Sequence, residues 1–318
     1  DESIHTTFAW NLYAGDGFQH NPMMHGPLLF EATAFNYLVF GVNDFTARLF
    51  VALVGVALVM TPLLFRKWLS PTGSMVAALL LLISPSISYY SRYIRHDVLL
   101  MFTAVILLWT MLQYLEDGRS LWLYLLAAVF AVMYATKEAS YFYTAIFGAL
   151  LIPPFVWQIS HLRWERPALR SLLFLALALT VASLGVLAWS FRHATTVEID
   201  LDDSGNSQMS EVSIPVWGRV GTGLALLTGL GAVVILYYAV GSKQMAELRV
   251  FDLLMVIGTL TLPLGTALLI RFVLGMDMNV VYEAVRTGNF GTIQPPVLVQ
   301  MGIVVLTVLA ISVALGLW

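Results

Sequence analysis

The chain contains no cysteine and few charged residues, with 16 Lys or Arg and 19 Asp or Glu among 318 residues. Without cysteine there is no disulfide, no thiol nucleophile and no cysteine-ligated metal. Charged residues make up 11% of the sequence and hydrophobic residues 59%, against about 25% and about 45–50% in soluble domains. This composition excludes a water-soluble globular enzyme. The formal charge of −3 also argues against a nucleic-acid partner.

Long apolar stretches occupy most of the sequence. We count nine stretches of roughly 17–24 mainly apolar residues, each near the ~20 residues that a helix needs to cross the hydrocarbon core. The sequence therefore predicts an all-α, polytopic transmembrane helical bundle. A transmembrane domain at residues 45–318 follows a polar loop at residues 1–44. The predicted spans are 45–65, 73–90, 97–115, 120–136, 139–157, 169–190, 217–240, 250–273 and 297–318.

The polar loop at residues 1–44 carries too many ionisable side chains for a lipid-buried helix. A short helix is expected between Ser3, its N-cap, and Gly15, and a second one over residues 28–40. Both are expected to lie in the membrane interface. Because Asp1 is not preceded by a methionine or a signal peptide, and because the last span runs to the chain end without a polar tail, we expect further residues at both ends.

Nine spans place several connections on the same side of the membrane as the first loop, here called the outer face. These connections are residues 91–96, 137–138, 193–216 and 274–296, and residues 193–216 are expected to form a solvated acidic loop or a small hairpin. Lys and Arg divide evenly, eight to each side, so their count does not decide the orientation. The outer face holds 14 of the 19 carboxylates. We therefore expect the chemistry there.

The first loop offers two candidate groups. Asp1 and Glu2 are adjacent carboxylates that could act as a general base or bind a metal, or could simply favour a helix N-terminus. His20 and His25 lie five residues apart among prolines. Two histidines alone are weak evidence for zinc, and they could instead donate hydrogen bonds to an anion or stabilise the loop.

The short connections hold two further groups. Arg92, Arg95 and Asp97 are crowded between two spans, where they could pair locally or bind a phosphate through the guanidinium fork. Lys137 and Glu138 could neutralise each other or point into a cavity on the outer face. All four groups are predicted on one face, where carboxylates could deprotonate a hydroxyl and cations could stabilise a departing phosphate. Sugar transfer from a lipid phosphate fits this chemistry.

Several motifs in a fixed order resemble a known superfamily. They are DE at residues 1–2, HGPLLF at 25–30, FTARLF at 45–50, LLISPSISYYSRYIRHD at 81–97 and ATKEASY at 135–141. Together they resemble the GT-C glycosyltransferases, in the branch of the protein O-mannosyltransferases and aminoarabinose transferases. Within that branch the chain is most similar to bacterial and archaeal proteins labelled flippase-activity-associated in protein glycosylation. The resemblance covers roughly residues 1–165.

The resemblance implies an extracytoplasmic active site in a prokaryotic cell membrane, a polyprenyl-phosphate sugar as donor, and inversion at the anomeric carbon. It maps the base to Asp1 or Glu2, the motif histidine to His25, and the arginine and aspartate of the later connection to Arg92 or Arg95 and Asp97. No cofactor is assigned from the sequence, and a divalent metal is left open. In contrast to the family, the first transmembrane helix and a soluble acceptor domain are not visible in this sequence.

A second hypothesis is a non-catalytic membrane protein of the same scaffold, either a lipid-linked sugar translocation factor or an accessory subunit of a larger membrane complex. A transporter should show broken helices and polar residues at mid-membrane. Here the middles of the predicted spans are nearly free of charge, and the ionisable residues gather at one face. This distribution favours chemistry at one face over passage through the membrane.

Overall fold

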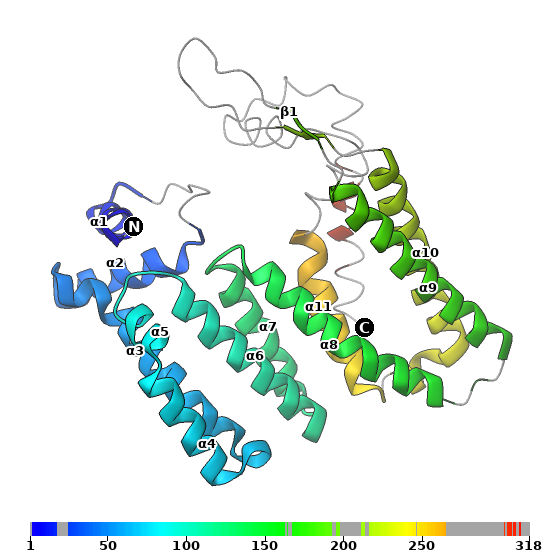
Figure 1. Cartoon of the computed structure of the whole chain (residues 1–318), viewed down its shortest axis with the longest axis horizontal. Coiled ribbons are helices and arrows are strands. Elements are labelled where there is room, and N and C mark those ends of the chain that lie inside the picture. The colour runs from blue at the N-terminus through cyan, green and yellow to red at the C-terminus, as the bar shows by residue number, and fades with distance from the viewer. Residues whose placement is uncertain are drawn as a thin grey trace. The chain divides into compact units, whose positions relative to one another are not determined.

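The computed structural model of the chain describes residues 2–17, 25–162, 164, 167–192, 195–197, 211–213, 216–245 and 247–264, together with 302, 304–306, 308, 309 and 312. The helices in these residues are α1 (Glu2–Ala14), α2 (Leu28–Phe40), α3 (Asp44–Met60), α4 (Arg66–Ile83), α5 (Pro85–Tyr90), α6 (Asp97–Asp117), α7 (Ser120–Tyr134), α8 (Ser140–His161), α9 (Pro167–Arg192), α10 (Val216–Met245), α11 (Arg249–Leu264) and the 3-10 helix η2 (Thr61–Phe65) (Figure 1). The strands β1 (Thr195–Val197) and β2 (Glu211–Ser213) pair antiparallel. Apart from this hairpin, the described structure is helical, as predicted.

Five stretches of the described chain are long and apolar enough to cross a membrane. They are Asp44–Ile83, Asp97–Asp117, Ser140–His161, Pro167–Ser190 and Val216–Val240. These stretches support an integral membrane protein, but they do not confirm nine spans. Asp44–Ile83 takes in the predicted span 45–65 and most of 73–90, and the non-helical Ser70 (φ 64°) interrupts it. The predicted span 120–136 corresponds to the shorter helix α7, and most of 297–318 lies outside the described residues.

The span predicted over residues 73–90 is wrong as a single helix. α4 ends at Ile83, Ser84 has extended backbone angles (φ −65°, ψ 120°), and Pro85 begins the separate helix α5. Proline has no N–H to continue the helix, and it disfavours helical angles at the residue before it. The break makes α5 a short independent element, and this helix carries Tyr89 and Tyr90.

Caps define the connection between α2 and α3. Gly41 ends α2 with φ 80°, and its N–H bonds to the carbonyl oxygen of Tyr37 at 3.0 Å. Asn43 then caps α3, because its Oδ1 accepts from the Thr46 N–H at 2.9 Å while Thr46 Oγ1 accepts from the Asn43 N–H at 3.1 Å. The second predicted helix of the first loop therefore has the expected bounds. The first begins at Glu2, so Ser3 lies within its first turn and is not the N-cap.

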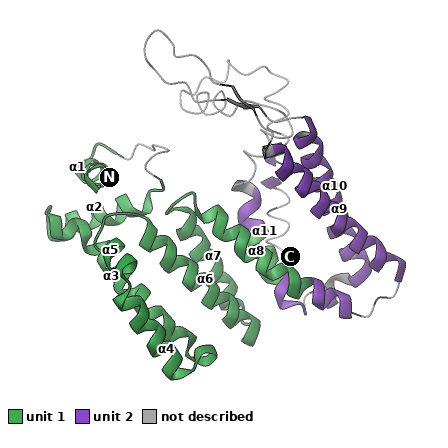
Figure 2. Ribbon diagram, viewed as in Figure 1, with its two compact units in different colours: residues 1–155, 252–257 green, residues 156–251, 258–318 purple. Residues whose placement is uncertain are grey.

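The chain divides into two compact units (Figure 2). Unit 1 comprises Asp1–Phe155 and Asp252–Ile257, and unit 2 comprises Val156–Phe251 and Gly258–Trp318. In unit 2, α9 packs along α10, and Thr180 Oγ1 donates to Thr228 Oγ1 at 2.9 Å. Every described residue of the predicted site belongs to unit 1, so the site can be described within this unit alone.

A buried cluster in unit 1 holds α1, α2 and α3 against the segment that begins α6. Its members are Ala9, Leu29, Tyr37, Ala47, Val51, Leu58, Ile94, Val98 and Leu99. Ile94 is 2% exposed, so the turn at residues 91–96 is anchored in this core. The backbone that carries the charged residues of this turn is thereby fixed relative to α1 and α3.

Candidate functional site

A pocket of about 360 Å³ lies between the start of α1, the start of α3, and α5 with the turn that follows it. Its lining combines a carboxylate, two guanidinium groups and two tyrosine rings. The lining residues, which we call the polar pocket, are Glu2, Arg48, Pro85, Ser88, Tyr89, Arg92 and Tyr93. Of the predicted site residues, the structure brings Glu2 and Arg92 together here.

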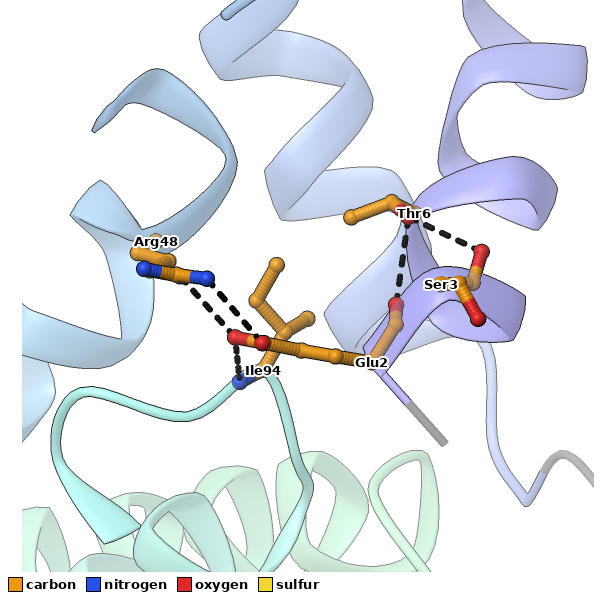
Figure 3. A network of polar contacts seen from close by, with 5 residues as sticks. All are labelled: Glu2, Ser3, Thr6, Arg48 and Ile94. Atoms are coloured by element: carbon orange, nitrogen blue, oxygen red, sulfur yellow. Dashed lines mark hydrogen bonds and ion pairs between the residues drawn. The ribbon is translucent and has the colours of Figure 1, made fainter. Parts of the chain in front are cut away.

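Glu2 is held by three N–H donors in the polar pocket (Figure 3). Its Oε1 accepts from Arg48 Nε at 2.9 Å and from the backbone N–H of Ile94 at 3.2 Å, and its Oε2 accepts from Arg48 Nη2 at 3.0 Å. The two-pronged ion pair joins α1 to α3, and the third bond joins both to the turn before α6. Thr6 Oγ1 adds a bond to the carbonyl oxygen of Glu2 at 3.1 Å. Glu2 is therefore an organising residue of the pocket wall.

Arg92 is the charged residue of the polar pocket that forms no ion pair with a described residue. Within the described part of the chain Arg92 forms no ion pair, whereas Arg48 is paired with Glu2. Among the described residues that line the pocket, two guanidinium groups and one carboxylate give one net positive charge. A singly charged phosphodiester would match this charge, and a guanidinium can bind two of its oxygens.

An apolar groove of about 300 Å³ adjoins the polar pocket. The two cavities share Ser88 and Arg92. The groove lies along α3 against the end of α4 and α5, and its lining residues are Ala52, Gly55, Val56, Val59, Met60, Leu82, Ile87, Ser88, Ser91 and Arg92. The paired cavities suit an amphiphile, with its anionic group at Arg92 and its apolar chain along α3.

A second charged cluster lies in the same unit. Lys137 Nζ donates to Asp97 Oδ1 at 2.9 Å, and Arg95 Nε lies 3.3 Å from Asp97 Oδ2. Asp97 is thus shared between two cations. Arg95 therefore has a partner inside the protein, and of the two predicted phosphate ligands only Arg92 lines the polar pocket.

His25 and Glu138 form a pair that closes the first loop onto the connection between α7 and α8. His25 Nδ1 lies 2.7 Å from Glu138 Oε2. Burial would raise the pKa of Glu138, but the hydrogen bonds from its own backbone N–H and from His25 outweigh that effect and lower the pKa. Glu138 is therefore a carboxylate that holds the imidazole in place.

Three hydrogen bonds fix the loop segment after His25. The Gly26 N–H donates to the Thr136 carbonyl oxygen at 3.2 Å, the Leu28 N–H donates to the Ala135 carbonyl oxygen at 3.1 Å, and His96 Nε2 donates to the Gly26 carbonyl oxygen at 3.2 Å. A Cβ on Gly26 would lie 2.1 Å from the Ala135 carbonyl oxygen. Only glycine fits at this position.

We expect Gly26→Ala to destabilise the protein by about 2 kcal/mol or more, because the new methyl group must push apart two hydrogen-bonded backbone segments. The thermal midpoint of the purified protein in detergent measures this effect. Gly148→Ala in α8 is the matched control, since nothing lies within 4 Å of the added Cβ. Equal midpoints for the two variants would contradict the tight fit at Gly26.

Two buried histidine side chains lie next to this loop segment and close to each other. His5 is 7% exposed and His96 is 1% exposed, and their ring centroids lie 5.3 Å apart. Burial, together with the smaller effects of the nearby His25, Arg95 and Lys137, lowers the pKa of His5 to about 4. Burial also lowers the pKa of His96 to about 4, against the opposing effect of its bond to Gly26. Both rings are therefore neutral at pH 7.

The protein should lose stability as the pH falls from about 6.5 towards about 4, because the unfolded histidines take up protons before the buried ones do. Each buried ring would contribute a loss of about 2 kcal/mol between pH 7.5 and pH 4.5. Thermal midpoints across this range measure the loss. His5→Phe keeps a ring but cannot titrate, so it should flatten the pH dependence, whereas the exposed His161→Asn should not. A pH dependence unchanged by His5→Phe would exclude His5 as its source.

Two predicted site residues, Asp1 and His20, lie outside the described residues, and one residue of the polar pocket, Arg48, was not predicted. No group of three or more His, Asp or Glu in the described part of the chain is placed to hold a metal ion. Sequence reasoning gave no role to Arg48, although an arginine that is the sole charge in the predicted span 45–65 is itself a signal of function.

The comparison with known proteins gives one family match. The dolichyl-phosphate-mannose-protein mannosyltransferase family matches residues 24–187, which is more than half of the chain. No curated protein and no solved structure matches the chain. The matched range contains His25, Arg92 and Glu138 and confirms the resemblance drawn from the motifs. The chain therefore belongs to the dolichyl-phosphate-mannose-protein mannosyltransferase family of membrane glycosyltransferases.

Proposed function

We propose that this protein transfers a sugar from a polyprenyl phosphate to a hydroxyl group of an acceptor at the extracytoplasmic face of a prokaryotic cell membrane. One observation carries the proposal: a polar pocket, whose described lining has one net positive charge, shares Ser88 and Arg92 with an apolar groove along α3. A polyprenyl-phosphate sugar has a single negative charge between a sugar and an apolar chain. It therefore matches the two cavities in charge and in polarity.

In the proposed reaction, Arg92 binds the phosphate of the donor. A carboxylate takes the proton of the acceptor hydroxyl as its oxygen attacks the anomeric carbon. The bond from that carbon to the phosphate oxygen breaks, and the lipid phosphate leaves with the electron pair. Attack from the side opposite the phosphate inverts the anomeric centre. Guanidinium groups stabilise the charge that develops on the leaving phosphate.

Asp1 is the base that we propose. Glu2 remains the alternative, but its two oxygens already accept three hydrogen bonds, two of them from Arg48. A base must come within ~2.6–3.2 Å of the proton that it abstracts. The fixed Glu2 supports a role in positioning its neighbour, because it ties the first turn of α1 to the pocket wall.

The other predicted site residues are assigned supporting roles. Arg95, Asp97 and Lys137 form an internal charge cluster, and we propose that it orients the turn that carries Arg92. His25 and Glu138 would hold the first loop in place, and the partly exposed His25 side chain would be available to an acceptor. His20 is retained as a candidate substrate ligand of the same loop.

The proposal is tested by incubating the purified full-length protein with polyprenyl-phosphate mannose and other polyprenyl-phosphate sugars, together with glycan, lipid and peptide acceptors. Mass spectrometry of the acceptors should detect addition of one sugar. If the protein binds the lipid but transfers no sugar from any donor, the non-catalytic alternative is favoured, either a translocation factor or an accessory subunit.

A further inference from the structure

Two tyrosines line the polar pocket with their rings stacked on each other. Tyr89 lies in α5 and Tyr93 in the turn that follows, and their ring centroids are 5.6 Å apart at an angle of 18°. Tyr89 is 59% exposed. Tyr90, between them, instead packs against the buried core of unit 1. Tyr89 and Tyr93 are therefore presented as a pair to the pocket, and Tyr90, whose ring meets that of Tyr89 edge-on, joins the pair to the core.

The surroundings of this pair are unlike those of a ring that faces only lipid. Glu2, Arg48 and Arg92 line the same pocket, so polar groups lie at its edge. A pyranose presents apolar C–H groups on a face and hydroxyls around its rim. Stacking that face on an aromatic ring removes apolar surface from water, while the rim finds hydrogen-bonding partners. The combination of ring face and charged edge fits a sugar.

The position of the pair relative to the apolar groove assigns the sugar to the donor. Ser88 and Arg92 border both cavities, whereas Tyr89 and Tyr93 border only the polar pocket. With the phosphate at Arg92 and the lipid in the groove, the tyrosines occupy the side where the sugar of the donor would extend. The apolar groove, Arg92 and the tyrosine pair thus follow one another in the same order as the lipid, the phosphate and the sugar of the donor.

We propose that Tyr89 and Tyr93 form a stacking platform for the sugar ring of the lipid-linked donor. The platform rests on the proposed function and adds to it the residues that bind the sugar. It recognises a pyranose through its C–H face, so the ring of Tyr89 matters more than its hydroxyl. Recognition by a ring face also predicts moderate selectivity among hexoses, since each has such a face.

The test compares binding of farnesyl phosphate with binding of its mannosyl, glucosyl and galactosyl phosphodiesters to the full chain in detergent, by calorimetry. Tyr89→Ala should weaken binding of the preferred sugar-linked lipid roughly tenfold and should leave binding of sugar-free farnesyl phosphate unchanged. Tyr89→Phe should retain most of the affinity for the sugar. Tyr124→Ala is the control, because Tyr124 is exposed on α7 and lines neither cavity.

Three results would overturn the platform. Tyr89→Ala could weaken binding of the sugar-linked and sugar-free lipids equally, which would make Tyr89 a lipid contact, or it could leave binding of both unchanged. The third is a wild type that binds no sugar-linked lipid more tightly than sugar-free farnesyl phosphate. Because the readout is binding, a wild type that binds the sugar through Tyr89 but transfers none would refute the proposed function and leave the platform standing.

Discussion

Asp1→Asn is expected to lower the turnover number by about 10²–10⁴-fold with little change in donor affinity, because a general base contributes to the transition state and not to binding of the donor. Steady-state kinetics with a polyprenyl-phosphate sugar measure both quantities. Activity of the wild type should rise with pH as the base loses its proton. The variant should lack this rise, because asparagine does not titrate.

Glu2→Gln separates the base from the residue that positions it. Glutamine keeps one oxygen for the N–H groups of Arg48 and Ile94 but loses the charge of the ion pair. We expect lower activity with the rise at low pH preserved. If that rise disappears in Glu2→Gln and persists in Asp1→Asn, then Glu2 is the base and our assignment is reversed.

Arg92→Ala should weaken donor binding by about 10²–10⁴-fold, since a guanidinium that binds two phosphate oxygens makes two charge-assisted hydrogen bonds of about 1.5–3 kcal/mol each. Arg92→Lys should give an intermediate loss, because lysine keeps the charge but not the fork. Calorimetric titration with farnesyl phosphate measures the affinities. The exposed Arg119, at the junction of α6 and α7, provides the control Arg119→Ala. Wild-type affinity in Arg92→Ala would remove the phosphate role.

Much of the helical structure follows from local sequence signals. Gly41 and Asn43 are recognisable as a helix end and a helix cap, and the second helix of the first loop has the predicted bounds. The span predicted over 73–90 failed because its hydropathy continues through Ser84 and Pro85, although the backbone chemistry of proline interrupts the helix there. Hydropathy indicates whether a segment is buried in lipid or protein, whereas the end of the helix at Ser84 depends on the N–H that Pro85 lacks.

The site was predictable only in part, because its decisive contacts join distant parts of the chain. Placing Glu2 and Arg92 near one face required only the alternation of spans. The ion pair between Glu2 and Arg48 joins residues 46 positions apart, and no local pattern indicates which cation a carboxylate will meet. The buried rings of His5 and His96 were equally hidden, since their neutral state results from tertiary burial.

The closure of the first loop onto the connection between α7 and α8 bears on how the protein is made. His25 and Glu138 are 113 residues apart, so at about 5–20 residues per second roughly 6–23 s of translation separate them. During this interval the nascent chain can insert α3, α4 and α6 into the membrane. The partners of the loop, which are the carbonyl groups of Ala135 and Thr136 and the carboxylate of Glu138, have not yet been synthesised. The segment from His25 to Leu28 can thus be fixed only after residues 135–138 have been made, whereas every residue that lines the apolar groove is made earlier.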